Sequence, residues 1–220
     1  MEFLGDYQNP AYANHYKVFV DKVRDAEKQA GRGDAVSKAV ARNLFKLMAY
    51  KDEYEVARLY TGAAFKSQLE ATFEGDYSIS FNLAPPLFSK KDASGHLLKR
   101  RYASWMMVAF KGLSRLRFLR GTAFDVFGYT EERRTERQLV ADYRASISNA
   151  LPALGLGDEG AKLLLALALL PERIRGFGHV KLANLQKTEE EKQALLLQLE
   201  ALAPKNATGE YREFPAGLAA

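Results

Sequence analysis

The feature that most constrains the fold of this chain is a helical spacing of apolar residues that recurs over most of its length. In the clearest run every step is three or four residues, and its members are Val36, Val40, Leu44, Leu47, Tyr50, Tyr54 and Ala57. Side chains at that spacing lie on one face of an α-helix. Asp34 precedes the run as a predicted N-cap, and Thr61-Gly62 ends it. We therefore predict one long helix here, buried on a single side.

The same spacing predicts further helices on both sides of this run. A helix over residues 13–30 ends at the glycines 31–33, and a shorter amphipathic stretch carries Phe65, Leu69 and Phe73. Later in the chain, Trp105, Val108, Leu113 and Leu116 predict a helix that stops near Gly121. The other predicted helical segments are one that Thr130 is predicted to cap, with a stripe from Val140 to Leu151, the apolar run 163–170, and a last helix from about 179 to 203.

One segment has a different period. Tyr77, Ile79, Phe81 and Leu83 alternate with polar or small residues, which predicts a half-buried strand that ends at Pro85-Pro86. Residues 90–96 are typical of an exposed turn, and residues 97–102 are expected to return as a second strand. The predicted fold class is therefore mainly α, a multi-helix domain with a small β-hairpin element. We expect a single domain over residues 1–203 and a loose tail over residues 204–220.

Charge and composition limit the classes of function. The net charge is +5, and residues 90–137 hold 12 basic and 5 acidic residues, whereas the segments before and after each carry −1. This local surplus favours an anionic partner: phosphate, carboxylate or an acidic protein surface. The chain has no cysteine, which excludes disulfides, thiolate nucleophiles and cysteine-ligated metal centres in it. No apolar run is long enough to span a membrane and no secretory signal is visible, so we predict a cytoplasmic location.

Five segments, in order, resemble the carboxy-terminal region of the indolepyruvate ferredoxin oxidoreductases, which are 2-oxoacid:ferredoxin oxidoreductases. The segments are Asn43–Arg58, Phe73–Asp76, Leu83–Leu87, Leu119–Thr122 together with Asp125–Arg137, and Ile174–Lys181. The similarity runs from about Tyr7 to Leu185. It implies a parent enzyme that decarboxylates arylpyruvates on thiamine diphosphate and Mg, passes electrons through iron–sulfur clusters to ferredoxin, and releases an acyl-coenzyme A.

The chain lacks the residues that this chemistry requires. The family binds the diphosphate and its metal with Gly-Asp-Gly followed by a distant Asn-Asn pair. Here Gly75-Asp76 and Gly157-Asp158 are followed by other residues, and Asn-Asn does not occur. We therefore expect no catalytic, cofactor-binding or metal-binding residue in this chain, which would be either an excised domain or a small subunit of a split enzyme. The expected partners are the catalytic domains or subunits of the parent enzyme, with ferredoxin as an alternative; no nucleic acid and no membrane are expected.

An arginine-rich segment is the first candidate site. Arg133 and Arg137 are one helical turn apart, and Arg120 and Arg134 are close enough in sequence to join them in a clamp for phosphate or carboxylate, such as the diphosphate of coenzyme A. In the alternative interpretation, these arginines pair with carboxylates inside the domain or across its interface with the rest of the enzyme, namely Glu131, Glu132, Glu136 and Asp125. The sequence favours this second interpretation, because ion pairs on helix surfaces are common.

A glycine-containing loop is the second candidate site. Arg175-Gly-Phe-Gly-His179, with Lys181 after it, could present backbone N–H groups to an anion at the start of the last helix. The interpretation that we favour is structural: Gly176 ends one helix in a left-handed conformation and Gly178 allows the next to begin. The leading functional hypothesis is an accessory, non-catalytic domain that stabilises assembly or docks a partner; the alternative is a small-anion binding domain that uses the arginines.

Overall fold

The computed structural model describes residues 1–83, 98–176 and 179–202, and for His179 the backbone alone. Over these ranges the chain is mainly helical with one two-stranded antiparallel sheet, which confirms the predicted fold class. The chain divides into two compact units, one formed by residues 1–6, 10–49 and 135 onward, the other by residues 7–9 and 50–134. The sequence analysis treated residues 1–203 as one domain and gave no sign of this division. The predicted tail, 204–220, lies outside the described residues.

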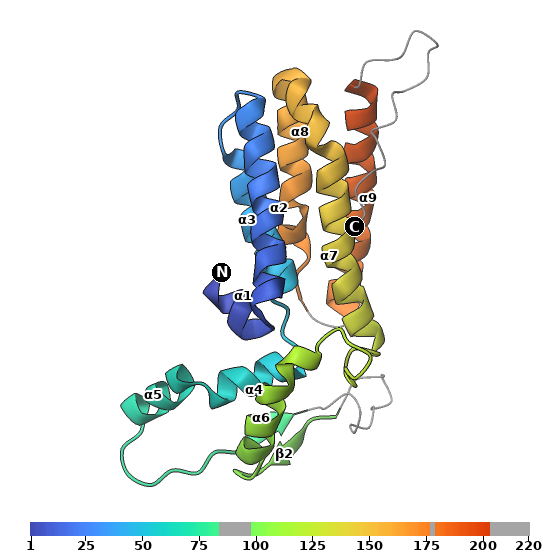
Figure 1. Ribbon diagram of the computed structural model, residues 1–220. Coiled ribbons are helices and arrows are strands. Elements are labelled where there is room, and N and C mark those ends of the chain that lie inside the picture. The colour runs from blue at the N-terminus through green and yellow to red at the C-terminus, as the bar shows by residue number, and fades with distance from the viewer. Residues whose placement is uncertain (84–97, 177–178, 203–220) are drawn as a thin grey trace. The chain divides into compact units, whose positions relative to one another are not determined.

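The first unit is a bundle of long helices. Its members are α2 (Pro10–Gln29), α3 (Ala35–Met48), α7 (Glu131–Ala150), α8 (Gly157–Leu169) and α9 (His179–Leu202), which run side by side in Figure 1. The short helix α1 (Glu2–Tyr7) precedes them. The 3₁₀ turn η2 (Leu151–Gly155) connects α7 to α8, and η3 (Leu170–Arg173) follows α8. Helices α2, α7 and α9 lie where the apolar periodicity predicts them, within a few residues, whereas α8 begins at Gly157, well before the predicted run 163–170.

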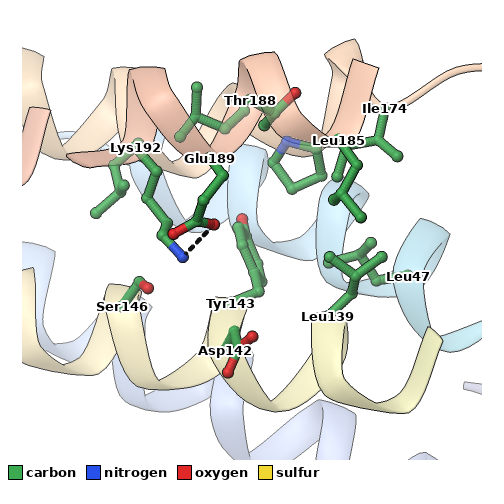
Figure 2. A pocket seen from close by; sticks show the side chains of 13 residues that line it. Leu47, Leu139, Asp142, Tyr143, Ser146, Ile174, Leu185, Thr188, Glu189 and Lys192 are labelled. Atoms are coloured by element: carbon green, nitrogen blue, oxygen red, sulfur yellow. Dashed lines mark ion pairs between the residues drawn. The ribbon is translucent and has the colours of Figure 1, made fainter. Parts of the chain in front are cut away.

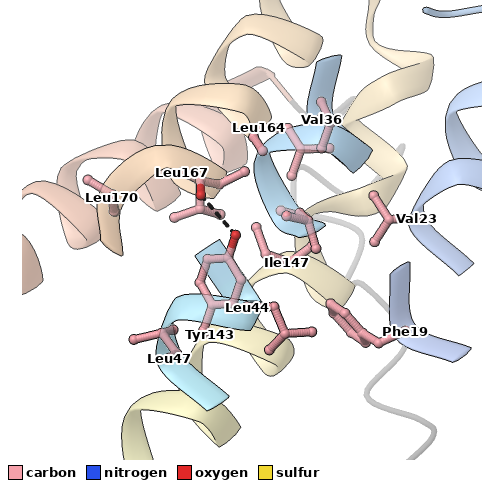
Figure 3. Close-up of a cluster of buried hydrophobic side chains, with 14 of the residues drawn as sticks. Phe19, Val23, Val36, Leu44, Leu47, Tyr143, Ile147, Leu164, Leu167 and Leu170 are labelled. Atoms are coloured by element: carbon pink, nitrogen blue, oxygen red, sulfur yellow. Dashed lines mark hydrogen bonds between the residues drawn. The ribbon is translucent and has the colours of Figure 1, made fainter. Parts of the chain in front are cut away.

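Apolar side chains from all five of these helices form the core of the first unit. Figure 3 shows Phe19, Val23, Val36, Leu44, Leu47, Tyr143, Ile147, Leu164, Leu167 and Leu170 packed together. Two polar groups reach into this core at the end of α8. The Tyr143 hydroxyl and the Asn43 amide both donate to the Ala168 carbonyl, at 2.8 and 3.0 Å. A carbonyl in the last turn of a helix has no partner within that helix, so these side chains satisfy it.

The contact between η2 and α8 depends on a glycine. A Cβ added at Gly160 would lie 2.2 Å from the backbone oxygen of Ala153 and 3.0 Å from the Leu156 Cβ. The absence of a side chain therefore lets η2 pack directly on the first turn of α8. Gly176 has a φ of +92°, the left-handed conformation expected of it. Gly178 lies outside the described residues.

The prediction of one long helix from Val36 to Ala57 is wrong. The chain leaves the helix after Met48 and starts a new one, α4 (Glu53–Thr61). Asp52 is the N-cap of α4: its backbone is extended, and its Oδ1 accepts a hydrogen bond from the Glu55 N–H at 2.8 Å. Asp34 occupies the N-cap position of α3 without making a side-chain capping bond.

The second unit combines short helices with the hairpin. Beyond α4 it contains α5 (Ala63–Thr72), β1 (Phe81–Leu83), β2 (Arg100–Tyr102), α6 (Met106–Arg115) and the 3₁₀ turn η1 (Leu116–Leu119). The strands pair antiparallel with Asn82 opposite Arg101. Helix α4 packs on α6, and their small core holds Ala57, Phe81 and Phe110. The strand is shorter than the predicted 77–83, and the predicted turn at 90–96 lies outside the described residues.

In helix α6, most of the apolar residues that predicted the helix lie on its exposed side. The residues that indicated the helix were Trp105, Val108, Leu113 and Leu116, but Trp105, Val108 and Leu116 are exposed. The side that faces the core carries Phe110, packed with Met106, Met107 and Leu113. Because α6 has apolar residues on two sides, the sequence alone indicated the helix but not its orientation.

Candidate functional site

Arg120 is the predicted site residue most fully enclosed by protein. Its guanidinium donates to the Asp52 carboxylate from Nε at 2.5 Å and from Nη2 at 2.7 Å. Its Nη1 donates to the backbone carbonyl of Tyr7. The Tyr7 ring stacks against the guanidinium, with 3.7 Å from Cζ to the ring centroid. Arg120 and Asp52 are both buried, so the arginine is held by a carboxylate of its own unit.

Arg120 stays protonated although it is buried. Burial lowers the pKa of Arg120, but the hydrogen bonds that Arg120 donates to Asp52 and the charge of that carboxylate outweigh it, so that the pKa lies above its ordinary value. A buried cation of this kind needs its counter-charge, because a lone ion in a low-dielectric interior is strongly unfavourable. Arg120 and Asp52 therefore form one structural group that links η1 to the first turn of α4.

A second buried carboxylate, Asp125, organises the loop after Arg120. Its Oδ2 accepts from the Gly121 N–H at 2.8 Å, and its Oδ1 accepts from the Gly128 N–H at 3.0 Å and the Tyr54 hydroxyl at 3.2 Å. Burial, reinforced by the Asp125 charge, raises the pKa of Tyr54. With all these bonds made inside the loop, Asp125 fixes the chain between Arg120 and helix α7.

Arg133 has a similar but less buried arrangement. Its Nε and Nη2 each lie 3.4 Å from an oxygen of the Glu53 carboxylate, and its Cζ is 5.7 Å from the centroid of the Tyr50 ring. Burial lowers the pKa of Arg133, and the Glu53 charge more than compensates, so the pKa is raised overall. Thr130 Oγ1 accepts from the Arg133 N–H at 3.4 Å, in agreement with its predicted role as the cap of α7.

The remaining predicted site residues have different surroundings. Arg134 is exposed on α7. Arg137, in the first unit, is partly buried. Arg175 donates from Nε to the backbone oxygen of Glu172 at 2.8 Å, and Lys181 forms an ion pair with Glu136. The side chain of His179 lies outside the described residues. The structure thus places the arginines Arg120 and Arg133 beside neighbouring carboxylates of one segment, residues 52–53.

Sequence reasoning missed the partners of these arginines and one lysine. Neither Asp52 nor Tyr7 was among the predicted site residues. Lys46, in the first unit, donates to the backbone oxygens of Pro171 at 2.6 Å and Ile174 at 3.1 Å. Burial, with the nearby charge of Arg175, lowers the pKa of Lys46. The one local signal was Asp52 three residues before Glu55, which is the spacing of an N-cap followed by an acidic N3 residue.

A small cavity lies in the first unit beside Tyr143 (Figure 2). It has a volume of about 50 Å³, and its apolar lining includes Leu47, Leu139, Ile174 and Leu185. Lys192 and Glu189, which form an ion pair, lie on the α9 side. Pockets for cofactors or drug-sized ligands enclose roughly 300–1,000 Å³. This cavity therefore has room for a few water molecules and is a packing gap between α7 and α9.

A second cavity of the first unit, about 180 Å³, adjoins the start of α3. The N-terminus of a helix attracts anions, but here that position is taken by the chain itself. The buried Glu27 carboxylate accepts from the Val36 N–H at 2.7 Å and the Ser37 N–H at 2.8 Å. Glu27 therefore caps α3 from α2.

Among the described residues, no group of three or more histidine, aspartate or glutamate side chains is placed to hold a metal ion. Over the same part of the chain, no helix is both long enough and apolar enough to cross a membrane.

Comparison with known proteins gives one match. Residues 1–194 match DUF6537, a family of unknown function. No curated protein and no solved structure matches the chain.

Proposed function

This chain belongs to the DUF6537 family, and we propose that it is an accessory, non-catalytic domain or small subunit of an indolepyruvate-type 2-oxoacid:ferredoxin oxidoreductase. In this role it binds the catalytic part of the enzyme and stabilises the assembly, in the cytoplasm. The parent enzyme supplies the thiamine diphosphate, the Mg and the iron–sulfur clusters.

The main observation in favour of a non-catalytic role is that two of the candidate arginines are paired with carboxylates of their own unit. Arg120 is bound bidentately by Asp52, and Arg133 lies against Glu53. A clamp for an external phosphate requires guanidinium groups that face an open space and are neutralised by the ligand. These two are neutralised by carboxylates of the same unit, which supports a structural role.

The observation that supports this particular parent enzyme is the order of the five similar segments. Two of them contain the residues of the ion pairs: Asn43–Arg58 includes Asp52 and Glu53, and Leu119–Arg137 includes Arg120 and Arg133. Two of the segments that resemble the oxidoreductase thus supply both of these ion pairs in the second unit. This is what a shared domain fold, as distinct from a shared active site, would produce.

The competing hypothesis is a small-anion binding domain for coenzyme A or phosphate. Of its four arginines, Arg134 is exposed, while Arg120 and Arg133 have carboxylate partners. Isothermal titration calorimetry of the pure chain with coenzyme A and with inorganic phosphate separates the two hypotheses. We expect no heat of binding at millimolar ligand; saturable heat that disappears in Arg134→Ala and Arg137→Ala variants would support the anion site.

The direct test is reconstitution. The pure chain is mixed with an indolepyruvate-type oxidoreductase from which the region matching residues 7–185 has been removed, and co-elution and arylpyruvate-dependent ferredoxin reduction are measured together. We expect co-elution, a higher thermal midpoint of the truncated enzyme, and no turnover by the chain alone.

Two results would overturn the proposal. Turnover by the chain alone would show that it carries chemistry of its own. Failure to co-elute, with an unchanged thermal midpoint, would show that the resemblance does not extend to assembly.

A further inference from the structure

We infer that the exposed side of helix α6 is a docking surface for a protein partner that presents an acidic, amphipathic helix. This inference rests on the proposed role as an accessory domain and identifies the surface that performs it. The surface, here called the α6 stripe, consists of Trp105, Val108, Ala109, Gly112 and Leu116.

The α6 stripe is apolar and exposed along its whole length. Trp105 is 59% exposed, Val108 72% and Leu116 43%, although all three are side chains that are normally buried. Steps of three and four residues place the five positions on one side of the helix. The opposite side, with Phe110, is already packed in the core of the second unit. Helix α6 therefore has a second apolar face that the described part of the chain leaves uncovered.

The shape of the stripe favours a helix as its occupant. Ala109 and Gly112 lie at its middle, and a Cβ added at Gly112 would meet nothing within 4 Å. The larger side chains of Trp105, Val108 and Leu116 stand around these small residues. A low centre between raised edges accepts the ridge of a second helix, because helices pack ridges into grooves at 8–10 Å separation.

The charges beside the stripe indicate the chemistry of the occupant. Residues 98–120 contain seven basic residues and no acidic one. Arg120 is neutralised by Asp52. Among described side chains, no carboxylate forms an ion pair with any of the other six, which are Lys99, Arg100, Arg101, Lys111, Arg115 and Arg117.

Two of these cations lie on α6 itself, next to the stripe. Lys111 and Arg115 are one turn apart and exposed, so they repel each other slightly in the isolated chain. Carboxylates on a partner would relieve this repulsion. Electrostatic matching of this kind sets the choice of partner and speeds association. The stripe is smaller than the roughly 800 Å² that each side of a standard interface buries, so contact must extend to the charged flank.

The same charges argue against a second copy of this chain as the occupant. A symmetric dimer through the α6 stripe would place Lys111 and Arg115 near their own copies, and like charges in an interface cost several kcal/mol, by order of magnitude. A lipid or nucleic-acid surface would also be anionic. Neither requires the recessed centre at Ala109 and Gly112, so we favour a protein helix and treat the others as outcomes of the test.

The test places a photo-activatable benzophenone amino acid at position 108 of the full chain, in the cells that produce it. Position 18 is the matched control, because Val18 is 58% exposed on α2 of the first unit. After irradiation, the cross-linked peptide is identified by mass spectrometry. We expect an adduct at 108, absent at 18, with a protein segment that is acidic and amphipathic at helical spacing.

Charge reversal supplies the second readout. The double variant Lys111→Glu/Arg115→Glu should lower the yield of that adduct about tenfold or more, because it opposes the partner's carboxylates. The double variant Arg24→Glu/Lys28→Glu has the same change in net charge one turn apart on exposed α2 and should leave the yield unchanged. Circular dichroism of both variants confirms that the helices are retained.

Several outcomes overturn the inference: an adduct with a second copy, with lipid or with nucleic acid; no adduct; or an adduct whose yield charge reversal does not change. The proposed function is judged separately. If the cross-linked partner is acidic but unrelated to the oxidoreductase, the docking surface is supported and the proposed function is refuted. If the Lys111→Glu/Arg115→Glu variant still co-elutes with the oxidoreductase, the proposed function is supported and the docking surface is refuted.

Discussion

Replacing Arg120 by methionine is expected to be the most destabilising single change in the second unit. The substitution removes two hydrogen bonds to Asp52, one to the Tyr7 carbonyl, and the stacking of the guanidinium on the Tyr7 ring. It leaves Asp52 buried with a charge and only its bond from the Glu55 N–H. Removing one partner of a buried ion pair costs about 3–5 kcal/mol. That is a large part of the roughly 5–15 kcal/mol by which a domain is stable.

Arg133→Met is the matched control. It removes the same kind of side chain from an ion pair with longer contacts, 3.4 Å, and partly exposed partners. Solvent screens such a pair, so we expect a loss of about 1 kcal/mol. The free energy of unfolding is measured by urea titration. Trp105 is the only tryptophan and lies in the second unit, so its fluorescence follows that unit, while circular dichroism follows the whole chain.

A double-mutant cycle isolates the pair itself. Asp52→Asn keeps a good N-cap for α4, because asparagine caps helices as well as aspartate does, and removes the charge that Arg120 neutralises. The double variant Asp52→Asn/Arg120→Met should therefore be more stable than the sum of the single losses predicts, by about 2 kcal/mol. Equal losses for Arg120→Met and Arg133→Met, or additive losses in the cycle, would refute the claim that Arg120 and Asp52 form a buried ion pair.

Two further predictions concern packing and pH. Gly160→Ala should lower the free energy of unfolding of the first unit by about 2 kcal/mol, because the added Cβ collides with the Ala153 oxygen. Gly155→Ala is the control and should be close to neutral, because nothing lies within 4 Å of its Cβ. Thermal unfolding followed by circular dichroism measures both variants, and equal midpoints would contradict the close contact at Gly160. Burial raises the pKa of Tyr54 and Tyr143 in the folded chain, so their contribution to stability is complete below about pH 10 and is lost as pH rises further. In a titration followed at 295 nm, part of the tyrosine absorbance should therefore appear only together with loss of helical circular dichroism, and ionisation of all eleven tyrosines near pH 10 in a still helical chain would contradict this.

Periodicity predicted most helices because burial of one face is a local property of the sequence. It failed between Met48 and Glu53 for a physical reason. Tyr50, Tyr54 and Ala57 continue the three- and four-residue spacing of the preceding helix, so the pattern has no interruption where the chain turns. The turn is stabilised by the cap at Asp52 and by the bond of that carboxylate to Arg120, 68 residues later. No local pattern contains a contact of that separation.

The arginine site was predictable in its chemistry but not in its partners. The sequence favoured internal ion pairs, with Glu131, Glu132, Glu136 and Asp125 as the expected carboxylates. The structure instead pairs Arg120 with Asp52 and Arg133 with Glu53, while Asp125 binds backbone N–H groups and the Tyr54 hydroxyl. Sequence proximity suggested carboxylates on the same segment, whereas the fold supplies them from the start of α4. Ion pairs within a folded unit form between residues that are close in space, and the spacing of residues along α7 does not show which residues those are.

The basic surplus of residues 90–137 thus divides into two classes with different consequences. Arg120 and Arg133 contribute to the count, but their charge is cancelled within the second unit and projects little field outward. Lys111 and Arg115 contribute equally to the count, yet they lie exposed beside an apolar stripe. A sum over sequence gives both classes the same weight. Burial separates them: the first class holds the fold together, and the second leaves a charged, apolar surface whose burial requires another molecule. If this chain binds an acidic partner, its affinity should therefore fall with salt and with substitutions on α6, and should be insensitive to the charge of Arg133 as long as the fold is retained.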